Sequence, residues 1–317
     1  MSINVVRIND QWFVEKSSTA GTRIDTTAAT TGELLADRAA IAAAVAADPQ
    51  PLPEGAWQSP VTAPCRLIAQ MTNYVSHIND SGMNPDTVPL TFFRKTSHSI
   101  SGPMDDIVKP AHVRFLDYEV EVGLIIGTDI PVGTTMTKAT LADYIAALVI
   151  TNDVSARDLQ LPKTQFFEAK SYPTFTPTGP RLVVLEPGDW DRFGDLRLRL
   201  WVNGALRQDA VIAQDMLYEP LEAITALTGF QPMAAGDLVL TGTPGGTALK
   251  APAKPVELIA AFLPPATKWK AFFRAQSRNP NYLADGDVVE LRIATDDGVL
   301  DLGYQRTVVR FAPEAGR

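Results

Sequence analysis

The stretch "FLDYEVEVGLIIG", residues 115–127, has the alternation that is typical of a β-strand. Asp117, Glu119 and Glu121 fall on every second position. Because side chains alternate between the two faces of a strand, we expect all three carboxylates on one face. The run that follows Glu121 is apolar on both faces, as in a strand that becomes fully buried. The stretch therefore predicts a core strand that gathers negative charge beside buried surface.

Carboxylates that lie next to buried surface need either raised pKa values or a bound cation. Oxygen-only ligands favour a hard divalent ion such as Mg²⁺ or Mn²⁺, with Ca²⁺ as a further candidate. The alternative is the solvated outer face of an edge strand, which needs no ion. Two carboxylates alone do not make a metal site, so this hypothesis depends on a further ligand elsewhere in the chain.

The segment "NDVSARDLQ", residues 152–160, contains a candidate for that ligand. If the segment forms a turn of helix, Asp153, Arg157 and Gln160 lie on one side of it. Asp153 is then a candidate third metal ligand, while Arg157 and Gln160 face what the metal binds, which suits a carboxylate or a 2-oxo group. An exposed Asp–Arg pair on a surface helix is the alternative.

Histidine is scarce, with three in the chain, and His77 lies three residues before Asp80. On a helical turn the two side chains are neighbours, so Asp80 could hold the imidazole ready to take a proton from water. A structural histidine is the alternative. The glycine-rich "LTGTPGGTAL", residues 240–249, lacks the ending of a phosphate-binding loop. It predicts a tight loop that brings the Thr243 hydroxyl toward a ligand, or else an inert turn.

The composition excludes several classes of protein. The net charge of −8 gives no support for a nucleic-acid or anionic-membrane partner, and no uncharged apolar run approaches the roughly 20 residues of a membrane span. The N-terminal residues lack the pattern of a signal peptide. The single cysteine, Cys65, excludes an internal disulfide framework. A cytoplasmic protein is the simplest interpretation.

A proline-rich stretch at residues 49–60 divides the chain. Before it, residues 3–16 predict a hairpin and residues 32–47 an alanine-rich helix. We therefore expect a small N-terminal α/β domain with its linker at residues 1–58 and a catalytic domain at residues 59–317.

Strand signals dominate the second region. Asn203-Gly204 and Asp297-Gly298 are two-residue hairpin turns. Helical periodicity is confined to three segments, residues 137–148, 218–229 and 255–275. Many strands with few intervening helices predict a mostly β fold with some α (α+β) and a largely antiparallel sheet. The basic and aromatic segment 250–283 is expected to pack on its own domain or on a second subunit.

Seven motifs, in this order, resemble the fumarylacetoacetate hydrolase family. They are "NYVSH", "FFRKTSHSISGP", "DYEVEVGLIIG", "NDVSARDLQ", "KSYPTFTPTGP", "VNG" and "GDLVLTGTPGG". The resemblance runs from about residue 59 to the C-terminal "DGVLDLGYQRTVV". It implies a mixed β-roll/β-sandwich catalytic domain, often with a small N-terminal domain, and a homodimer. It also implies a metal-dependent enzyme that acts on 2-oxo or β-dicarbonyl acids.

The resemblance also implies roles for individual residues. The metal ligands, normally for Mg²⁺ or Mn²⁺, are Glu119, Glu121 and Asp153, whereas Asp117 is not expected to be a ligand. The residues expected to bind or polarise the substrate are Tyr74, Arg157, Gln160, Lys170 and Thr243. His77 matches the catalytic histidine on a mobile lid, with Asp80 as its partner.

This sequence departs from the family pattern in three ways. Asp80 stands where the family often has the longer Glu, "QMTNY" replaces the commoner Gly-x-Asn-Tyr form, and the segment 250–283 is longer than in compact members. These departures bear on the particular reaction more than on the class of chemistry.

The first functional hypothesis is hydrolysis of a C–C bond in a β-diketone acid such as an acylpyruvate or fumarylacetoacetate, as in aromatic-compound catabolism. His77, held by Asp80, would activate water, and Lys170, Arg157 and Gln160 would stabilise the charge that develops on oxygen. Decarboxylation or tautomerisation of 2-oxo dicarboxylates is the alternative, with oxaloacetate or 2-hydroxyhepta-2,4-diene-1,7-dioate as examples. An inactive metal-binding scaffold is a third reading.

Overall fold

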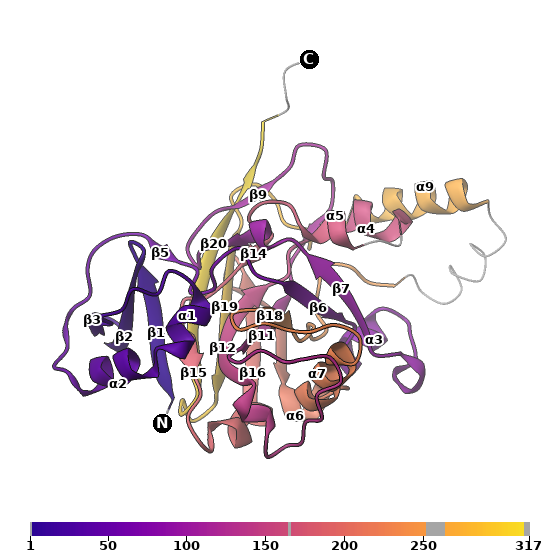
Figure 1. The fold of residues 1–317 in the computed structure, drawn as a ribbon. Helices are drawn as coiled ribbons and strands as arrows, with labels where there is room; N and C mark the ends of the chain where they lie inside the picture. The colour runs from indigo at the N-terminus through magenta and orange to yellow at the C-terminus, as the bar shows by residue number, and fades with distance from the viewer. Residues whose placement is uncertain (1, 164–165, 252–263, 314–317) are drawn as a thin grey trace.

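Two β-sheets packed face to face form the body of the protein (Figure 1). The computed structural model describes residues 2–163, 166–251 and 264–313. One core cluster fills the space between the sheets, with Val122 and Leu148 from the larger sheet against Leu198 and Leu291 from the smaller one. The α+β fold predicted from the sequence is confirmed.

The larger sheet has eleven strands among the described residues, and all its pairs are antiparallel except β18 with β6. In spatial order they are β4 (Gln50–Pro51), β3 (Ala20–Arg23), β2 (Gln11–Ser17), β1 (Ile3–Ile8), β15 (Leu182–Val184), β12 (Ile145–Asn152), β11 (Val120–Ile126), β18 (Leu238–Leu240), β6 (Leu67–Met71) and β7 (Thr91–Lys95), with β5 (Trp57–Gln58) paired to β1.

The smaller sheet has five strands in the described part of the chain. Their order is β17 (Ala205–Val211), β16 (Leu196–Val202), β19 (Val288–Thr295), β20 (Asp301–Phe311) and β9 (Ile107–Lys109). Two short pairs lie outside both sheets: β10 (Leu116–Asp117) with β13 (Ser155–Ala156), and β8 (Ile100–Ser101) with β14 (Thr176–Pro177).

The helices are short and peripheral. The α-helices are α1 (Thr31–Ala36), α2 (Arg38–Ala46), α3 (Val75–Asp80), α4 (Arg157–Lys163), α5 (Phe167–Lys170), α6 (Ile212–Asp215), α7 (Pro220–Thr228) and α9 (Pro265–Gln276). The 3-10 turns are η1 (Pro85–Thr87), η2 (Ser97–Ser99), η3 (Leu141–Asp143) and η4 (Asp189–Asp195). Within the described ranges, none of these helices has the length and apolar character needed to cross a membrane.

The N-terminal region continues the larger sheet. The predicted hairpin is confirmed, with Asn9 and Asp10 at φ 50° and 62° in its turn. The predicted alanine-rich helix is two helices, because Asp37 ends α1 and caps α2 by accepting a hydrogen bond from Ala40 N at 3.2 Å. Strand β1 also pairs with β15, so the two regions share one sheet. A domain boundary at residue 58 stays a prediction.

The two-residue hairpin turn at Asn203-Gly204 is confirmed, and so is the helix at 218–229, which is α7. A hairpin is also present at Asp297-Gly298, but its turn is longer than two residues, because Thr295 N donates to Leu300 O. The helix predicted at 137–148 is wrong, because that segment contains η3 and the start of β12. All eight residues of β12 are buried, and a strand buried on both faces cannot be told from a buried helix by its pattern.

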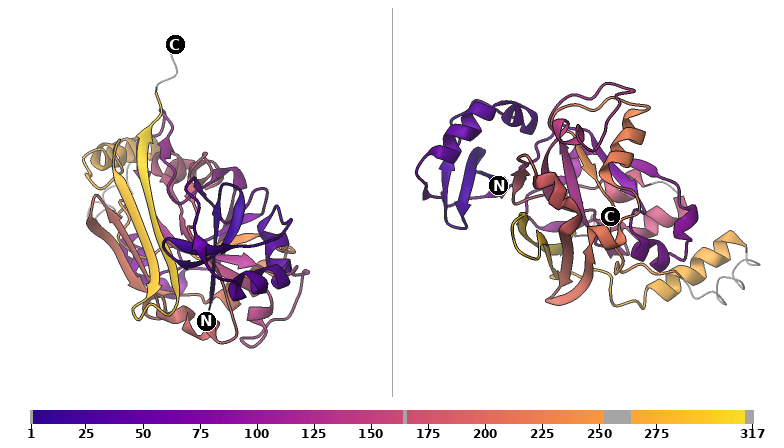
Figure 2. Two further views of the ribbon diagram at one scale, coloured as in Figure 1. Left: turned by 90° about the vertical axis from the view of Figure 1, so that its left-hand side faces the viewer. Right: turned by 90° about the horizontal axis from the view of Figure 1, so that it is seen from below.

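The third predicted helix is α9, which extends away from the body in two views (Figures 1 and 2). Residues 252–263 of the predicted segment lie outside the described residues. The Phe273 ring packs on Phe115 with centroids 5.8 Å apart, and Phe115 in turn packs on Tyr282 at 5.0 Å. The aromatic face of α9 is thus anchored to the start of the stretch that carries the acidic residues.

Candidate metal centre and active site

The acidic stretch 115–127 forms two strands instead of one. Strand β10 ends at Asp117 and pairs with β13, whereas β11 begins at Val120 and pairs with β12 and β18. The expectation that three carboxylates share one strand face is therefore wrong for Asp117. Its carboxylate accepts hydrogen bonds from Arg157 Nε at 2.8 Å and from Ala248 N at 2.8 Å.

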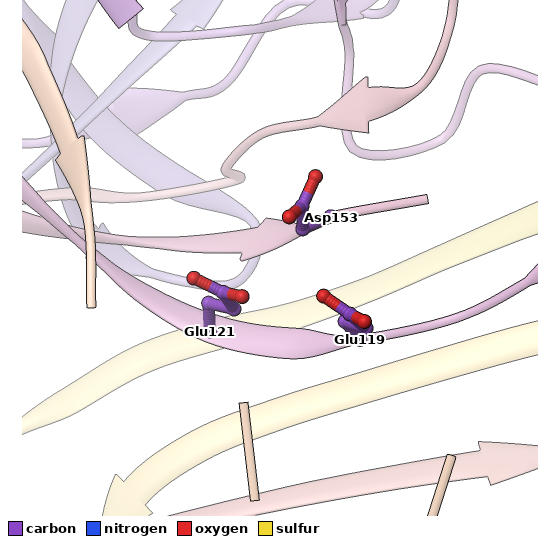
Figure 3. Close-up of side chains that lie close together, drawn as sticks. All are labelled: Glu119, Glu121 and Asp153. Atoms are coloured by element: carbon purple, nitrogen blue, oxygen red, sulfur yellow. The ribbon is translucent and has the colours of Figure 1, made fainter. Parts of the chain in front are cut away.

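Glu119 and Glu121 meet Asp153 in a buried cluster (Figure 3). One carboxylate oxygen of each residue lies within 4.8 Å of the others. Asp153 follows the last residue of β12, and the antiparallel register places it beside Glu119, whose carbonyl accepts from Asp153 N at 2.9 Å. A strand end, not the predicted turn of helix, brings Asp153 to this place, because α4 begins only at Arg157.

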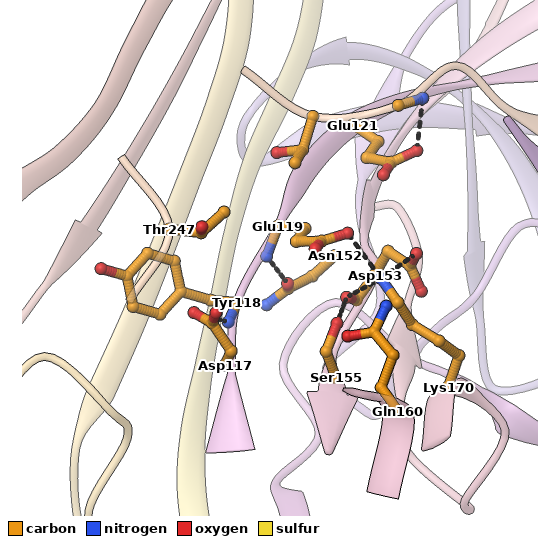
Figure 4. Close-up of polar contacts among 12 residues, drawn as sticks. Asp117, Tyr118, Glu119, Glu121, Asn152, Asp153, Ser155, Gln160, Lys170 and Thr247 are labelled. Carbon is orange, nitrogen blue, oxygen red and sulfur yellow. Dashed lines mark hydrogen bonds and ion pairs between the residues drawn. The ribbon is translucent and has the colours of Figure 1, made fainter. Parts of the chain in front are cut away.

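Two buried lysines neutralise part of this cluster. Lys170, the last residue of α5, donates from Nζ to Glu119 Oε2 and to Asp153 Oδ2, each at 2.6 Å (Figure 4). Lys95, the last residue of β7, donates to Asp153 Oδ1 and to Phe175 O. Sequence reasoning missed Lys95. The sequence feature that could have revealed it is its position two residues after Phe93, on the same face of the aromatic strand β7.

Arg157 links the cluster to Asp117. Its Nη2 donates to Glu119 Oε1 at 2.5 Å and its Nη1 to Gln160 Oε1 at 2.8 Å. The guanidinium is 3% exposed, so its three partners hold it rigidly. The predicted grouping of Arg157 and Gln160 with Asp153 and the glutamates is found, and helix α4 supplies the first two.

The pKa values of Glu119 and Glu121 are shifted in opposite directions. Burial raises the pKa of Glu119, but Lys170 and Arg157 outweigh it and lower that pKa from 4.5 to about 2. The pKa of Glu121 is raised well above 4.5 by burial and then by Asp153 and Glu119. Glu121 accepts a hydrogen bond from Gly242 N at 2.7 Å, which offsets only part of this effect.

A divalent ion fits these residues. The donor set is three carboxylates, which suits Mg²⁺, Mn²⁺ or Ca²⁺ and not a soft metal. Burial, followed by Asp153 and Glu119, raises the pKa of Glu121. A cation shared by the three carboxylates would favour the ionised form of Glu121.

His77 lies on α3, and burial lowers the pKa of its imidazole, while Glu119 raises it and Arg157 and Lys170 lower it. The ring is therefore neutral and within electrostatic range of the cluster. Its Nδ1 is buried without a hydrogen-bond partner. The expected pairing with Asp80 is wrong: Asp80 Oδ2 accepts from Gly246 N at 2.9 Å instead. The helical turn is present, but the carboxylate faces the glycine-rich loop.

The two remaining predicted residues differ in their availability. The Thr243 hydroxyl donates to Val120 O at 2.9 Å and accepts from Gln208 Nε2 at 2.9 Å, so it already serves the fold. The Tyr74 hydroxyl is buried without a partner, and burial followed by the nearby Glu121 raises its pKa. Of these two hydroxyl groups, that of Tyr74 is the one free to donate a hydrogen bond to a ligand. Substrate contact remains a prediction for both.

Comparison with known proteins identifies the family of this chain. Residues 66–310 match the family profile described as "Fumarylacetoacetate (FAA) hydrolase C-terminal". A mitochondrial oxaloacetate tautomerase from Rattus norvegicus is 32% identical over 195 residues, which is 60% of this chain and 59% of that protein. The chain thus spans about three fifths of the length of this relative.

Two solved structures are similar over nearly the whole chain. A probable 2-hydroxyhepta-2,4-diene-1,7-dioate isomerase from Mycobacterium abscessus has a TM-score of 0.74 and 27% identity, and covers 99% of this chain and 100% of its own. A fumarylacetoacetate hydrolase from Exiguobacterium antarcticum has a TM-score of 0.71 and 25% identity, and covers 98% and 100%. The family match spans most of the chain, and the chain therefore belongs to the fumarylacetoacetate hydrolase family.

Proposed function

We propose that this protein is a divalent-metal-dependent enzyme that tautomerises or isomerises a small 2-oxo dicarboxylic acid through its enolate. The observation that carries the proposal is the neutral, unpaired His77 imidazole within electrostatic range of the buried Glu119–Glu121–Asp153 cluster. A neutral imidazole with a free ring nitrogen can accept a proton from a carbon that lies next to a carbonyl group.

The cluster residues would hold Mg²⁺ or Mn²⁺, which when bound lowers the cost of negative charge on the oxygens of a 2-oxo acid. Lys170, already within 2.6 Å of Glu119 and Asp153, would place an ammonium beside the oxygen that becomes negative. Arg157 donates hydrogen bonds to Glu119 and to Gln160, so Gln160 helps to hold the group that orients Glu119. The Nδ1 atom of His77 would accept the proton from one position of the substrate and return it at another.

Similar proteins support this reading. The Rattus norvegicus relative is named for oxaloacetate tautomerisation, and the Mycobacterium abscessus structure for isomerisation of a diene dioate. Both reactions move a proton within one molecule and need no attacking water. We extend this class of substrate to the present chain as part of the proposal.

Hydrolysis of acylpyruvates is the second candidate, favoured by the similarity to the Exiguobacterium antarcticum hydrolase. It requires His77 to activate water without the help of Asp80, because the Asp80 carboxylate accepts a hydrogen bond from Gly246 N instead. A water-activating histidine normally has a partner that orients it. For this reason we propose tautomerisation ahead of hydrolysis, the first prediction from the sequence.

The experiment that tests the proposal is product analysis with Mn²⁺ or Mg²⁺ on oxaloacetate, a 2-hydroxy diene dioate and an acylpyruvate. In H₂O, tautomerisation leaves the substrate mass unchanged, hydrolysis gives products whose masses together exceed the substrate by one water, and decarboxylation loses CO₂. In D₂O, tautomerisation incorporates deuterium at carbon. We expect metal-dependent deuterium incorporation that EDTA abolishes. Acylpyruvate cleavage as the fastest reaction would favour the second candidate.

The homodimer and the cytoplasmic location stay predictions. Sedimentation of the purified protein would test the first, and fractionation of the producing cell the second.

A further inference from the structure

Helix α3 carries His77. Its residue Ser76 forms hydrogen bonds with a carboxylate from a distant part of the chain. Ser76 N donates to Asp215 Oδ1 at 2.8 Å, and the Ser76 hydroxyl donates to Asp215 Oδ2. Asp215 is the last residue of α6 and lies 139 positions away in sequence. One carboxylate thus holds both the backbone and the side chain of the residue next to His77.

The same hydroxyl ties α3 to the glycine-rich loop. Ser76 Oγ accepts a hydrogen bond from Gly245 N at 2.7 Å, and a Cβ atom at Gly245 would lie 3.1 Å from Ser76. Such a distance is tighter than ordinary van der Waals contact, so glycine permits this approach. Three residues earlier the loop donates from Gly242 N to Glu121. The loop therefore connects α3 to the candidate metal cluster.

The residues after Asp215 extend this contact along the chain. Leu217 N donates to Asn73 O and Tyr218 N to Asn73 Oδ1, each at 2.8 Å. Tyr74 and Met216 form a β-bridge next to these hydrogen bonds. The segment that leads into α3 is thus held in register against the segment that follows α6.

We propose that Asp215 is a positioning residue, which holds Ser76 and thereby fixes the His77 ring beside the Glu119–Lys170 pair. The inference rests on the proposed function in one respect, namely that His77 transfers the proton. Because His77 Nδ1 has no hydrogen-bond partner, the placement of α3 sets where that atom lies. A misplacement of about 1 Å at a reacting group can cost roughly a hundredfold in rate.

The first test compares Asp215→Ala with Asp37→Ala. Asp37 is a matched control, since its carboxylate also accepts one helix N–H, from Ala40 at 3.2 Å, and one hydroxyl, from Thr26 at 2.7 Å, but in the N-terminal region. We expect both variants to lower Tm, and only Asp215→Ala to lower kcat, by roughly tenfold to a hundredfold. Mn²⁺ affinity, measured by calorimetry, should stay unchanged in both. Equal kcat values in the two variants would overturn the proposal.

The second test asks whether Asp215 acts through His77. In a His77→Ala background, Asp215→Ala should leave the residual turnover unchanged, because the group that it positions is gone. Ser76→Ala and Asp215→Ala should be non-additive in their effects on kcat. A further loss of turnover in the His77→Ala background would show a purely structural role and overturn the proposal.

The third test needs no activity. The chain has three histidines, so their ring signals in an NMR spectrum can be assigned by substitution. Asp215→Asn, which keeps one acceptor and serves if the alanine variant does not fold, should shift or broaden the His77 ring signal alone. An unmoved His77 signal would overturn the positioning role even if turnover is normal. A wild-type enzyme without turnover on any substrate would overturn the proposed function and leave this result standing.

Discussion

Lys95 donates a hydrogen bond to Asp153 across 58 positions of the sequence, from the edge strand β7 to the end of β12. Both side chains are at most 1% exposed. A second Nζ hydrogen bond goes to Phe175 O at 2.9 Å. Asp153 therefore has an ammonium on each of its oxygens, Lys95 on Oδ1 and Lys170 on Oδ2.

Replacing Lys95 by Met should destabilise the metal-free protein and strengthen Mn²⁺ binding. The substitution leaves a buried carboxylate with one cation fewer, which costs about 3–5 kcal/mol of unfolding free energy. The same excess of negative charge favours a bound dication. Denaturant-induced unfolding in the presence of EDTA measures the stability of the metal-free protein. Titration calorimetry with Mn²⁺ measures the affinity for the metal. Lys138→Met is the control, because the Lys138–Glu219 pair is exposed and contributes almost nothing. Weaker Mn²⁺ binding in Lys95→Met would contradict this account.

Glu121 should make the metal-free protein less stable as the pH rises. Its folded pKa lies above the ordinary value of 4.5, so the stability due to its protonated form is complete below pH 4.5 and is lost as the pH rises through the folded pKa. Glu121→Gln should therefore be more stable than the wild type at neutral pH when both are metal-free. Thermal unfolding at a series of pH values in EDTA measures this difference.

Glu119 should show the opposite dependence. Its folded pKa of about 2 lies below 4.5, so its stabilisation is present above pH 4.5 and is lost as the pH falls toward 2. Glu119→Gln should accordingly be less stable than the wild type at neutral pH. The same unfolding series compares the two variants, and equal shifts in the two would argue against the separate environments described here.

Glu119→Gln should also weaken Mn²⁺ binding by at least about tenfold, since it removes one charged oxygen ligand. Asp117→Asn is a matched control because both carboxylates accept from Arg157, while only Glu119 belongs to the acidic cluster. We expect calorimetry to give a much smaller change in Mn²⁺ affinity for Asp117→Asn. Equal losses would mean that Arg157, and not the cluster, governs metal binding.

The period-two pattern was sufficient to find Glu119 and Glu121, although Glu119 lies one residue before β11 begins at Val120. Asp153 was found through its neighbours Arg157 and Gln160, although the predicted helix was wrong and the strand end of β12 places it. The family resemblance supplied Lys170. These residues lie within motifs short enough to be recognised without knowledge of the fold.

Lys95, Asp80 and Asp215 show what the sequence could not supply. Each acts through a partner that is distant in sequence: Asp153, Gly246 and Ser76, respectively. For Asp80 the nearby His77 was the better local partner, but the backbone N–H of the glycine-rich loop takes the carboxylate. Such choices depend on sheet order and loop packing, and these emerge only when the chain has folded.

Removing residues 1–58 tests whether the N-terminal region is a separate domain. Val5, Trp12 and Leu34 share one buried cluster with Leu67 and Leu240, which lie after residue 58. Deletion would uncover this apolar surface and the edge of β15, which pairs with β1.

We therefore expect residues 59–317 alone to aggregate or to unfold at a much lower temperature, as measured by size-exclusion chromatography and calorimetry. The full-length chain with Val45→Ala is a control, because Val45 is 37% exposed and contributes little to this core. A monodisperse fragment with wild-type Mn²⁺ affinity would instead support the boundary at residue 58 that the proline-rich stretch predicts. The shared sheet and the shared apolar cluster favour the first outcome. A region that shares its hydrophobic core with the rest of the chain is not expected to be dispensable for stable folding.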